Sequence, residues 1–272
     1  MSFKGAYHGS THGSMSVSYN ESKKAAFRPL LPEVYFIGLN EHKDLALIDS
    51  STAGVILETI QGDAGVRVPS QEYMSALRQR CDEVGAQLIF DEVQVGLGRT
   101  GKMWAFEHYD VIPDILTLGK ALGGGLPIGA MITSKENMAL FTHDPVLGHI
   151  TTFGGNPVVC AAANASLEYL VDKVNLDEVN RKGQALHQFF KEMTGVKEVR
   201  SKGLFFAVDL ESAELVQEVV ESCLNKGLIT FWFLSCPNAF RLAPPLNLTW
   251  KELEKAKTIL KSVFVNIVGE KG

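Results

Sequence analysis

Nowhere does the sequence hold an uninterrupted run of about 20 apolar residues, the length that a transmembrane helix needs. The first residues, MSFKGAYHGSTHGSMSVS, also lack the apolar core of a signal peptide. We therefore expect no contact with a membrane and a cytoplasmic location.

Cysteines are few, and none forms a C-x-x-C pair. The chain has four in 272 residues, and each lies in an apolar or helical context: Cys81, Cys160, Cys223 and Cys236. A disulfide framework is unusual in a chain of this length. We expect reduced thiols in the core and no metal site.

A strong excess of positive or negative charge is also missing. The 26 basic and 31 acidic residues are interspersed and sum to a net charge of −5, so nothing favours nucleic acid as a partner. Hydrophobic residues make up 46% of the chain, which is ordinary for a globular protein. The length is that of one large domain or two smaller ones.

Short apolar runs in the first half predict buried strands with little alternation, as in a sheet covered on both faces. They span residues 53–60, 86–93, 114–122 and 127–134. Residues 70–85 predict a helix between the first two strands, with Ser70 as its N-cap and Gly85 at its end. This order of elements indicates parallel crossover units, and hence an α/β fold.

The second half of the sequence predicts a different order of helices and strands. We expect a long helix from Asn156, a strand over 202–210, a helix over 213–227, a hairpin formed by 228–235 and 239–245, and a last helix from Thr249. Thr249 and Glu252 have the spacing of a capping box. We place a domain boundary near residue 171, with a large domain over 1–170 and a smaller α+β domain over 171–272.

Gly96, Gly98 and Gly101 match the spacing G-x-G-x-x-G of a dinucleotide-binding loop. In such a loop the first glycine lies at the end of a strand, and the last opens a long helix. Here four residues separate Gly96 from Asp91, and Pro113 interrupts the segment that follows. We therefore do not predict a dinucleotide site.

Polar residues at strand ends are better candidates, because ligands of open parallel sheets bind beyond the carboxyl ends of the strands. Glu58 ends the first strand, Asp91 and Gln94 end the second, and Lys120 ends the third. A salt bridge or a solvent-reaching lysine would explain any one of them alone. Together, a carboxylate and a lysine suit pyridoxal phosphate, which uses a lysine Schiff base and an acidic partner for its ring nitrogen.

The segment LIFDEVQVGLGRTGKMWAFEHYDVIPDILTLGKALGGGLPIGAMI closely resembles the signature of class III pyridoxal-phosphate aminotransferases. This family of amino-acid metabolism includes acetylornithine, ornithine and 4-aminobutyrate aminotransferases. Further matches follow in family order: YHGSTHG, ETIQGDAGV, TTFGGNP and FRLAPPL. The resemblance covers nearly the whole chain and implies the fold type I transferase architecture, a mostly parallel central sheet flanked by helices.

The resemblance implies a role for each residue around the cofactor ring. Lys120 would form the Schiff base and later move the proton of the substrate carbon. Asp91 would hold the ring nitrogen protonated, and Gln94 would bind the 3-oxygen. Val93 and Tyr7 would pack on opposite ring faces, although simple core packing is the alternative for Tyr7.

Other matching residues would act at the edge of the site. Thr152 resembles the threonine that reaches the cofactor phosphate of the partner subunit, which implies a homodimer with shared active sites. His8 and His12 would line the site without transferring protons.

Two further residues would bind the substrate. Arg241 resembles the arginine that binds the substrate carboxylate, with a structural salt bridge as the alternative. Glu58 would pair with Arg241 when the substrate presents an amine. One pocket would then accept an ω-amino acid in one half-reaction and 2-oxoglutarate in the other.

The chain departs from the family pattern in three places. Thr59 stands where the family usually has proline, and Asp63 where it has glutamate. The upstream part of the family, with its phosphate-binding loop, has no counterpart before Met1. We therefore expect these 272 residues alone to bind the cofactor weakly. A decarboxylase or aminomutase of the same family, and a catalytically incomplete fragment, remain alternatives to an aminotransferase.

Overall fold

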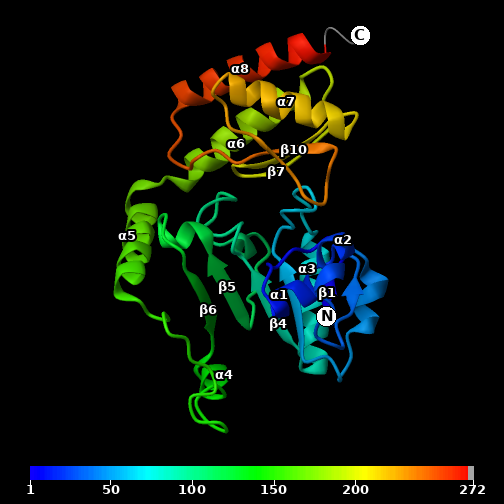
Figure 1. Ribbon diagram of the computed structural model, residues 1–272, viewed down its shortest axis with the longest axis vertical. Helices are drawn as coiled ribbons and strands as arrows, with labels where there is room; N and C mark the ends of the chain where they lie inside the picture. Colours follow the sequence, from blue (N-terminus) through cyan, green and yellow to red (C-terminus); the bar gives the residue numbers. More distant parts are fainter. Residues whose placement is uncertain (269–272) are drawn as a thin grey trace.

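The structure is a computed structural model that describes residues 1–268. It contains two four-stranded sheets and one pair of short strands. Figure 1 shows the first sheet and its helices below, and a second sheet covered by helices above. We call residues 1–156 the N-terminal unit and residues 174–268 the C-terminal unit. Helix α5 (Pro157–Lys173) joins them and begins at Asn156, whose side chain accepts hydrogen bonds from two backbone N–H groups of the first turn.

The sheet of the N-terminal unit has the order β3-β4-β5-β6. Its strands are β3 (Gly54–Glu58), β4 (Gln87–Asp91), β5 (Ile115–Gly119) and β6 (Gly129–Thr133). The first three are parallel, whereas β6 runs antiparallel to β5. All four predicted strands are therefore present. The expectation that both faces are covered is wrong for β6, where three of five residues are exposed and the other two are half-buried.

Helix α3 (Gln71–Val84) connects β3 to β4 and confirms the predicted crossover. The Ser70 side chain accepts a hydrogen bond from the backbone N–H of Tyr73, and Gly85 ends the helix with φ 77°. Both caps lie where the sequence predicts them, because serine satisfies a free N–H of the first turn and glycine adopts the left-handed conformation without strain.

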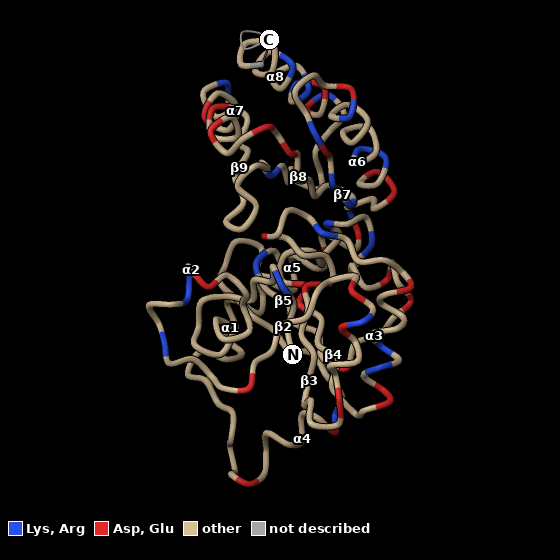
Figure 2. Tube along the Cα trace, turned by 90° about the vertical axis from the view of Figure 1, so that its right-hand side faces the viewer, with Lys and Arg blue, Asp and Glu red and all other residues tan. Residues whose placement is uncertain are grey.

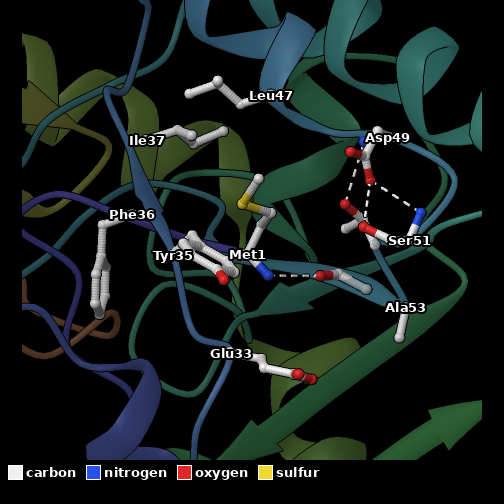
Figure 3. A pocket seen from close by; sticks show the side chains of 11 residues that line it. Met1, Glu33, Tyr35, Phe36, Ile37, Leu47, Asp49, Ser51 and Ala53 are labelled. Carbon is white, nitrogen blue, oxygen red and sulfur yellow. Dashed lines mark hydrogen bonds between the residues drawn. The ribbon is translucent and has the colours of Figure 1, made fainter.

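The first 50 residues, for which the sequence predicted no elements, form short helices and strands, of which β1 lies beside β3. These are β1 (Ser2–Phe3), α1 (His12–Val17), α2 (Glu21–Lys24), η1 (Ala25–Phe27), β2 (Phe36–Ile37) and η2 (His42–Leu47). Strand β1 pairs with β2, and the backbone N–H of Ile56 donates to the carbonyl of Met1. The Met1 ammonium donates to the carbonyl of Gly54, as Figure 3 shows.

The remaining elements of the N-terminal unit are short. They are η3 (Ala105–His108), η4 (Lys120–Gly123) and α4 (Lys135–Ala139). Helix α4 lies at the far end of the molecule from the C-terminal unit (Figure 1).

The C-terminal unit has an antiparallel sheet of order β7-β8-β10-β9. Its strands are β7 (Glu198–Lys202), β8 (Phe205–Asp209), β9 (Phe231–Trp232) and β10 (Ala239–Leu242). Its helices are α6 (Leu176–Lys191), α7 (Ala213–Asn225) and α8 (Trp250–Val268). The predicted hairpin is confirmed by the pairing of Arg241 with Phe231. The predicted capping box is confirmed too, because Thr249 and Glu252 exchange side-chain to backbone hydrogen bonds.

The side chains of β8 alternate between two hydrophobic cores. Phe206 and Val208 pack under α6, α7 and α8, whereas Phe205 and Ala207 point to the other face. That face packs on the N-terminal unit through a cluster of eight buried residues: Ile60, Val66, Val95, Ala105, Phe205, Ala207, Phe233 and Ala239. Since Ile60 follows β3 and Val95 follows β4, this cluster holds the C-terminal unit beside the ends of the central strands. The placement of a domain boundary near residue 171 stays a prediction.

Charges of both signs occur on the helices, and Figure 2 shows both signs on α3 and α6. Arg78 pairs with Asp82 at 2.7 Å on α3, and Arg181 pairs with Glu178 on α6. In residues 1–268, no helix is long and apolar enough to cross a membrane. Cys81 and Cys223 are buried, but Cys160 is exposed on α5, so the expectation of four core thiols is wrong for Cys160.

Candidate active site

Three parallel strands end side by side at one edge of the N-terminal sheet. Glu58 is paired in register with Asp91, and Asp91 with Thr117, two residues before the end of β5. A cavity of about 250 Å³ lies at this edge. It is lined by Tyr7, His8, Gly9, Glu58, Ile60, Asp91, Val93, Gln94, Val95 and Lys120. Seven of the nine predicted site residues therefore meet at one cavity.

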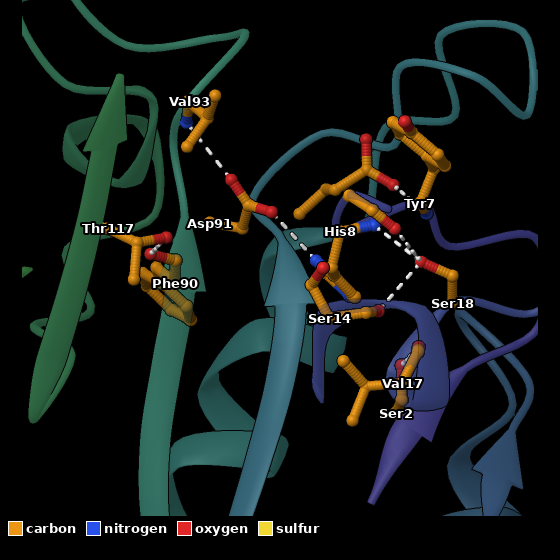
Figure 4. A network of polar contacts seen from close by, with 12 residues as sticks. Ser2, Tyr7, His8, Ser14, Val17, Ser18, Phe90, Asp91, Val93 and Thr117 are labelled. Atoms are coloured by element: carbon orange, nitrogen blue, oxygen red, sulfur yellow. Dashed lines mark hydrogen bonds and ion pairs between the residues drawn. The ribbon is translucent and has the colours of Figure 1, made fainter. Parts of the chain in front are cut away.

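Asp91 forms a nearly buried pair with His8. Its Oδ2 lies 2.7 Å from Nδ1 of His8, and the two side chains are 10% and 2% exposed. Because an ionised carboxylate only accepts, Nδ1 carries the shared proton. Asp91 Oδ1 accepts from the backbone N–H of Val93 at 3.0 Å, and the backbone N–H of His8 donates to Ser18 (Figure 4). These contacts fix the carboxylate in one orientation.

The other ring nitrogen of His8, Nε2, is buried and has no hydrogen-bond partner among residues 1–268. A buried polar atom without a partner is costly in an apolar setting. Its presence in the wall of the cavity is consistent with a site built for a polar ligand.

Glu58 is 5% exposed and closes another side of the cavity. Its two oxygens accept hydrogen bonds from the backbone N–H groups of Tyr7 and Gly62, at 2.9 and 2.8 Å. Burial raises the pKa of Glu58 to about 7, although nearby His8 and the two backbone donors oppose the shift. The charge of this wall thus changes near neutral pH.

This pKa leads to a prediction about stability. The folded pKa of about 7 exceeds the ordinary value of 4.5, so the contribution of Glu58 is fully present below pH 4.5 and is lost as the pH rises to about 7. We expect the unfolding free energy of the parent, relative to Glu58→Gln, to fall by up to about 3 kcal/mol across this window. Urea unfolding at a series of pH values measures it. A difference that does not change with pH would contradict it.

Lys120 follows β5 directly, in the first turn of η4. Its φ is 44°, a left-handed backbone conformation that is uncommon for a residue other than glycine. Strained residues of this kind cluster at functional sites. The side chain is exposed, and Asp91 pairs with His8 instead of Lys120. The end of β5 opens into the cavity, so the Lys120 amine can be reached from it.

Two glycines keep the cavity walls close. A methyl group on Gly62 would lie 2.1 Å from Oε1 of Gln94, and one on Gly119 would lie 3.3 Å from a methyl carbon of Val93. Glycine at these positions lets the side chains of Gln94 and Val93 sit against the backbone.

Two predicted site residues, and one predicted neighbour, do not line the cavity. Thr152 is exposed in the segment before α5. Arg241 lies on β10 with its guanidinium over the rings of Phe231 and Phe233, at 5.5 and 5.9 Å. Burial lowers the pKa of Arg241, and the nearby Asp63 carboxylate opposes the shift. His12 contacts the carbonyl of Pro29. Among residues 1–268, Arg241 forms no ion pair with Glu58.

No pattern in the sequence predicts the role of Glu92, next to Asp91. This residue is 1% exposed, and it accepts hydrogen bonds from the backbone N–H groups of Ala105 and Phe106 and from the Thr59 hydroxyl. Burial raises its pKa to about 7. Glu92 thereby ties the start of η3 to the end of β3. Thr59, a departure from the family pattern, is a part of this tie.

The glycine-rich loop packs against protein. A methyl group on Gly98 would meet Leu246 at 2.9 Å, and one on Gly101 would meet Asn180 at 1.9 Å. Both contacts are with the C-terminal unit. The loop thus serves packing, in agreement with the rejection of a dinucleotide site.

A larger cavity of about 690 Å³ lies near Met1 and is drawn in Figure 3. Its lining includes Glu33, Tyr35 and Asp49, and it contains none of the predicted site residues. It has no lysine, arginine or histidine in its wall. The smaller cavity at the strand ends is therefore the better candidate for chemistry.

A lysine directly after β5 and a carboxylate at the end of β4 are what the resemblance to class III aminotransferases implies. A comparison of the chain with models of known protein families agrees. A family profile described as "Aminotransferase class-III" matches residues 1–264. The chain belongs to the class-III aminotransferase family. The resemblance seen in the sequence is thereby confirmed.

Curated members of the class-III family are similar over most of the chain. A [LysW]-aminoadipate semialdehyde/glutamate semialdehyde transaminase of Sulfolobus acidocaldarius is 36% identical over 98% of this chain and 68% of its own. The mitochondrial acetylornithine aminotransferase of Alnus glutinosa is 40% identical over 96% of this chain and 58% of its own. The chain thus spans roughly two thirds of the length of these class-III relatives.

Solved structures of aminotransferases are also similar to this chain. The ornithine aminotransferase of Toxoplasma gondii superposes with a TM-score of 0.91 at 31% identity, over 99% of this chain and 64% of the other. An amine transaminase from an uncultivated Pseudomonas species, solved in a PLP-bound form, has a TM-score of 0.87 at 27% identity, over 98% and 69% of the two chains. The predicted fold type I architecture of the class-III family is confirmed.

Proposed function

We propose that the protein is an aminotransferase that uses pyridoxal phosphate to move an ω-amino group to 2-oxoglutarate. The observation that supports this most is the meeting of Lys120 with the Asp91–His8 pair at one cavity. The two groups lie at the ends of neighbouring parallel strands, where the chemistry of this cofactor requires an amine and a carboxylate.

The residues of the cavity fit the pyridine ring of the cofactor. His8 and the Val93 N–H hold Asp91 in one orientation. Each carboxylate oxygen can accept a second hydrogen bond, so Asp91 can also accept one from a donor in the cavity. Gln94 offers an amide to a ring oxygen, and Val93 and Tyr7 supply apolar surfaces. When bound, the cofactor supplies an aldehyde that reacts with amines and a ring that withdraws electrons.

Each of these side chains then has a task. The Lys120 amine would hold the cofactor covalently and, once displaced by the incoming amine, move a proton at the substrate carbon. Asp91 would keep the ring nitrogen protonated through a charge-assisted hydrogen bond. His8 donates through Nδ1 to Asp91 Oδ2 and so positions it.

The substrate side of the proposal rests on Arg241 and Glu58. A guanidinium suits a carboxylate because it can donate two parallel hydrogen bonds. Arg241 has no carboxylate partner within ion-pair distance among residues 1–268, so its guanidinium can bind the carboxylate of a substrate. Glu58 would pair with it when the substrate presents an amine.

We further propose a homodimer in which Thr152 reaches the cofactor phosphate of the other subunit. The exposure of Thr152, outside the cavity of its own chain, supports this assignment. A cytoplasmic location stays a prediction, and the Alnus relative is named as mitochondrial.

A coupled assay for glutamate tests the function. Purified protein with excess pyridoxal phosphate and 2-oxoglutarate is offered acetylornithine, ornithine or 4-aminobutyrate, with a no-donor control. We expect glutamate from at least one donor. Release of CO₂ without glutamate would contradict the proposal and favour a decarboxylase.

A further inference from the structure

A separate cavity of about 410 Å³ lies between the two units, where α6 and β7 meet the segment around η3. It shares no lining residue with the candidate active site. Its wall consists of His108, Asn180, Gly183, Gln184, His187, Gln188, Ser201, Lys202 and Gly203.

The wall of this cavity has positively charged and neutral polar groups but no negatively charged side chain. It offers an ammonium, two imidazoles, three carboxamides and a hydroxyl, and it contains no carboxylate. Lys202 forms no ion pair with any residue of the described part of the chain, 1–268. A cavity with this composition has a surplus of hydrogen-bond donors and of positive charge.

Both imidazoles of the wall have a lowered pKa. The pKa of His108 is lowered to about 4, first by burial and then by the positive charge of Lys202. The pKa of His187 is also lowered, by burial and by Lys191. Burial is the larger cause of both shifts, and a nearby ammonium adds to each; a bound anion would offset only this second contribution.

The side chains are held in place before any ligand arrives. Nδ1 of His187 lies 2.8 Å from the Ser201 hydroxyl, and Nε2 of His108 lies 3.2 Å from the carbonyl of Thr100. The Asn180 amide donates to the carbonyl of Gly101 at 3.0 Å. A preorganised site loses less conformational entropy on binding.

We propose that this cavity binds a phosphate group, free or as a monoester, with Lys202 as its charged ligand and His187, Gln184 and Asn180 as further donors. Phosphate suits the wall because its several oxygens can accept from separate donors, and lysine is a common point charge for phosphate. Both units form the wall of this cavity, since His108 belongs to one and Lys202 to the other. This site is additional to the proposed active site and independent of it.

Nuclear magnetic resonance of the histidine rings tests the proposal. The protein is titrated with inorganic phosphate or with glycerol 3-phosphate, at constant ionic strength. Neither probe has an aldehyde, so reaction at Lys120 does not contribute. We expect saturable shifts of the His108 and His187 signals. Tighter binding of inorganic phosphate would identify the free ion as the ligand, and tighter binding of the ester a phosphorylated metabolite.

A matched pair of variants completes the test. Lys202→Gln removes the charge from the cavity, and Lys226→Gln removes an exposed charge elsewhere in the same unit. We expect binding at least about tenfold weaker in Lys202→Gln and unchanged in Lys226→Gln. Phosphate also stabilises proteins without a specific site, so the comparison of the two variants is decisive. Equal affinities in both, or no saturable shift in the parent, would overturn the proposal.

Discussion

Replacing Lys120 by alanine is expected to lower amino transfer by about 10⁴-fold or more, because no other group at the cavity can take over a covalent role. In the described part of the chain, Lys120 is the only lysine in the wall of this cavity. The backbone at this position already has a φ of 44°, and alanine and lysine are similarly strained there, so the fold should be little affected. The measurement is glutamate formation with saturating pyridoxal phosphate.

A spectroscopic readout separates the loss of the covalent bond from a general loss of activity. At saturating pyridoxal phosphate, which offsets weak binding, the parent should develop the absorbance band of a lysine–cofactor Schiff base, and Lys120→Ala should not. The exposed Lys135 on α4, which lies outside the cavity, is the matched control. Lys135→Ala should keep both the activity and the band. A band of equal strength in Lys120→Ala would show that another amine holds the cofactor.

The second large effect concerns stability. Gly203 lies in the turn between β7 and β8, with φ 56°. A methyl group there would lie 2.5 Å from the carbonyl carbon of Thr100 and 2.7 Å from the oxygen of Arg99, both backbone atoms of the glycine-rich loop. Backbone cannot move aside as a flexible side chain can. We expect Gly203→Ala to lower the free energy of unfolding by about 3–5 kcal/mol, the sum of steric overlap and strain.

Gly227 provides the control for this prediction. Its φ is 80°, yet a methyl group there would meet nothing within 4 Å. Gly227→Ala therefore reports the strain alone, about 1 kcal/mol. Denaturant unfolding of both variants measures the difference. Equal losses in the two variants would show that the contact between the units relaxes at no cost.

Much of the N-terminal sheet could be predicted from local signals. The caps of α3 at Ser70 and Gly85 and the apolar runs of β3, β4 and β5 follow rules that involve near neighbours. The gathering of Glu58, Asp91 and Lys120 followed in turn, because parallel strands end at one edge of their sheet.

Other features depend on contacts that spacing does not encode. His8 and Asp91 are 83 residues apart, and only the fold shows that they form a pair. Helix α6 was missed because Gly183 interrupts its pattern, and glycine is a poor helix former. The structure supplies the reason for that glycine. A methyl group at position 183 would lie 2.3 Å from the carbonyl oxygen of Gly203.

The outer edge of β6 has a consequence for the behaviour of the protein in solution. In residues 1–268, β6 pairs only with β5, and Met131 and Ile132 are 41% and 51% exposed. An apolar edge strand with free N–H and C=O groups can add a strand from another molecule, which is a common start of aggregation. Preparations of these 272 residues should therefore lose soluble protein in proportion to their concentration, well before they unfold.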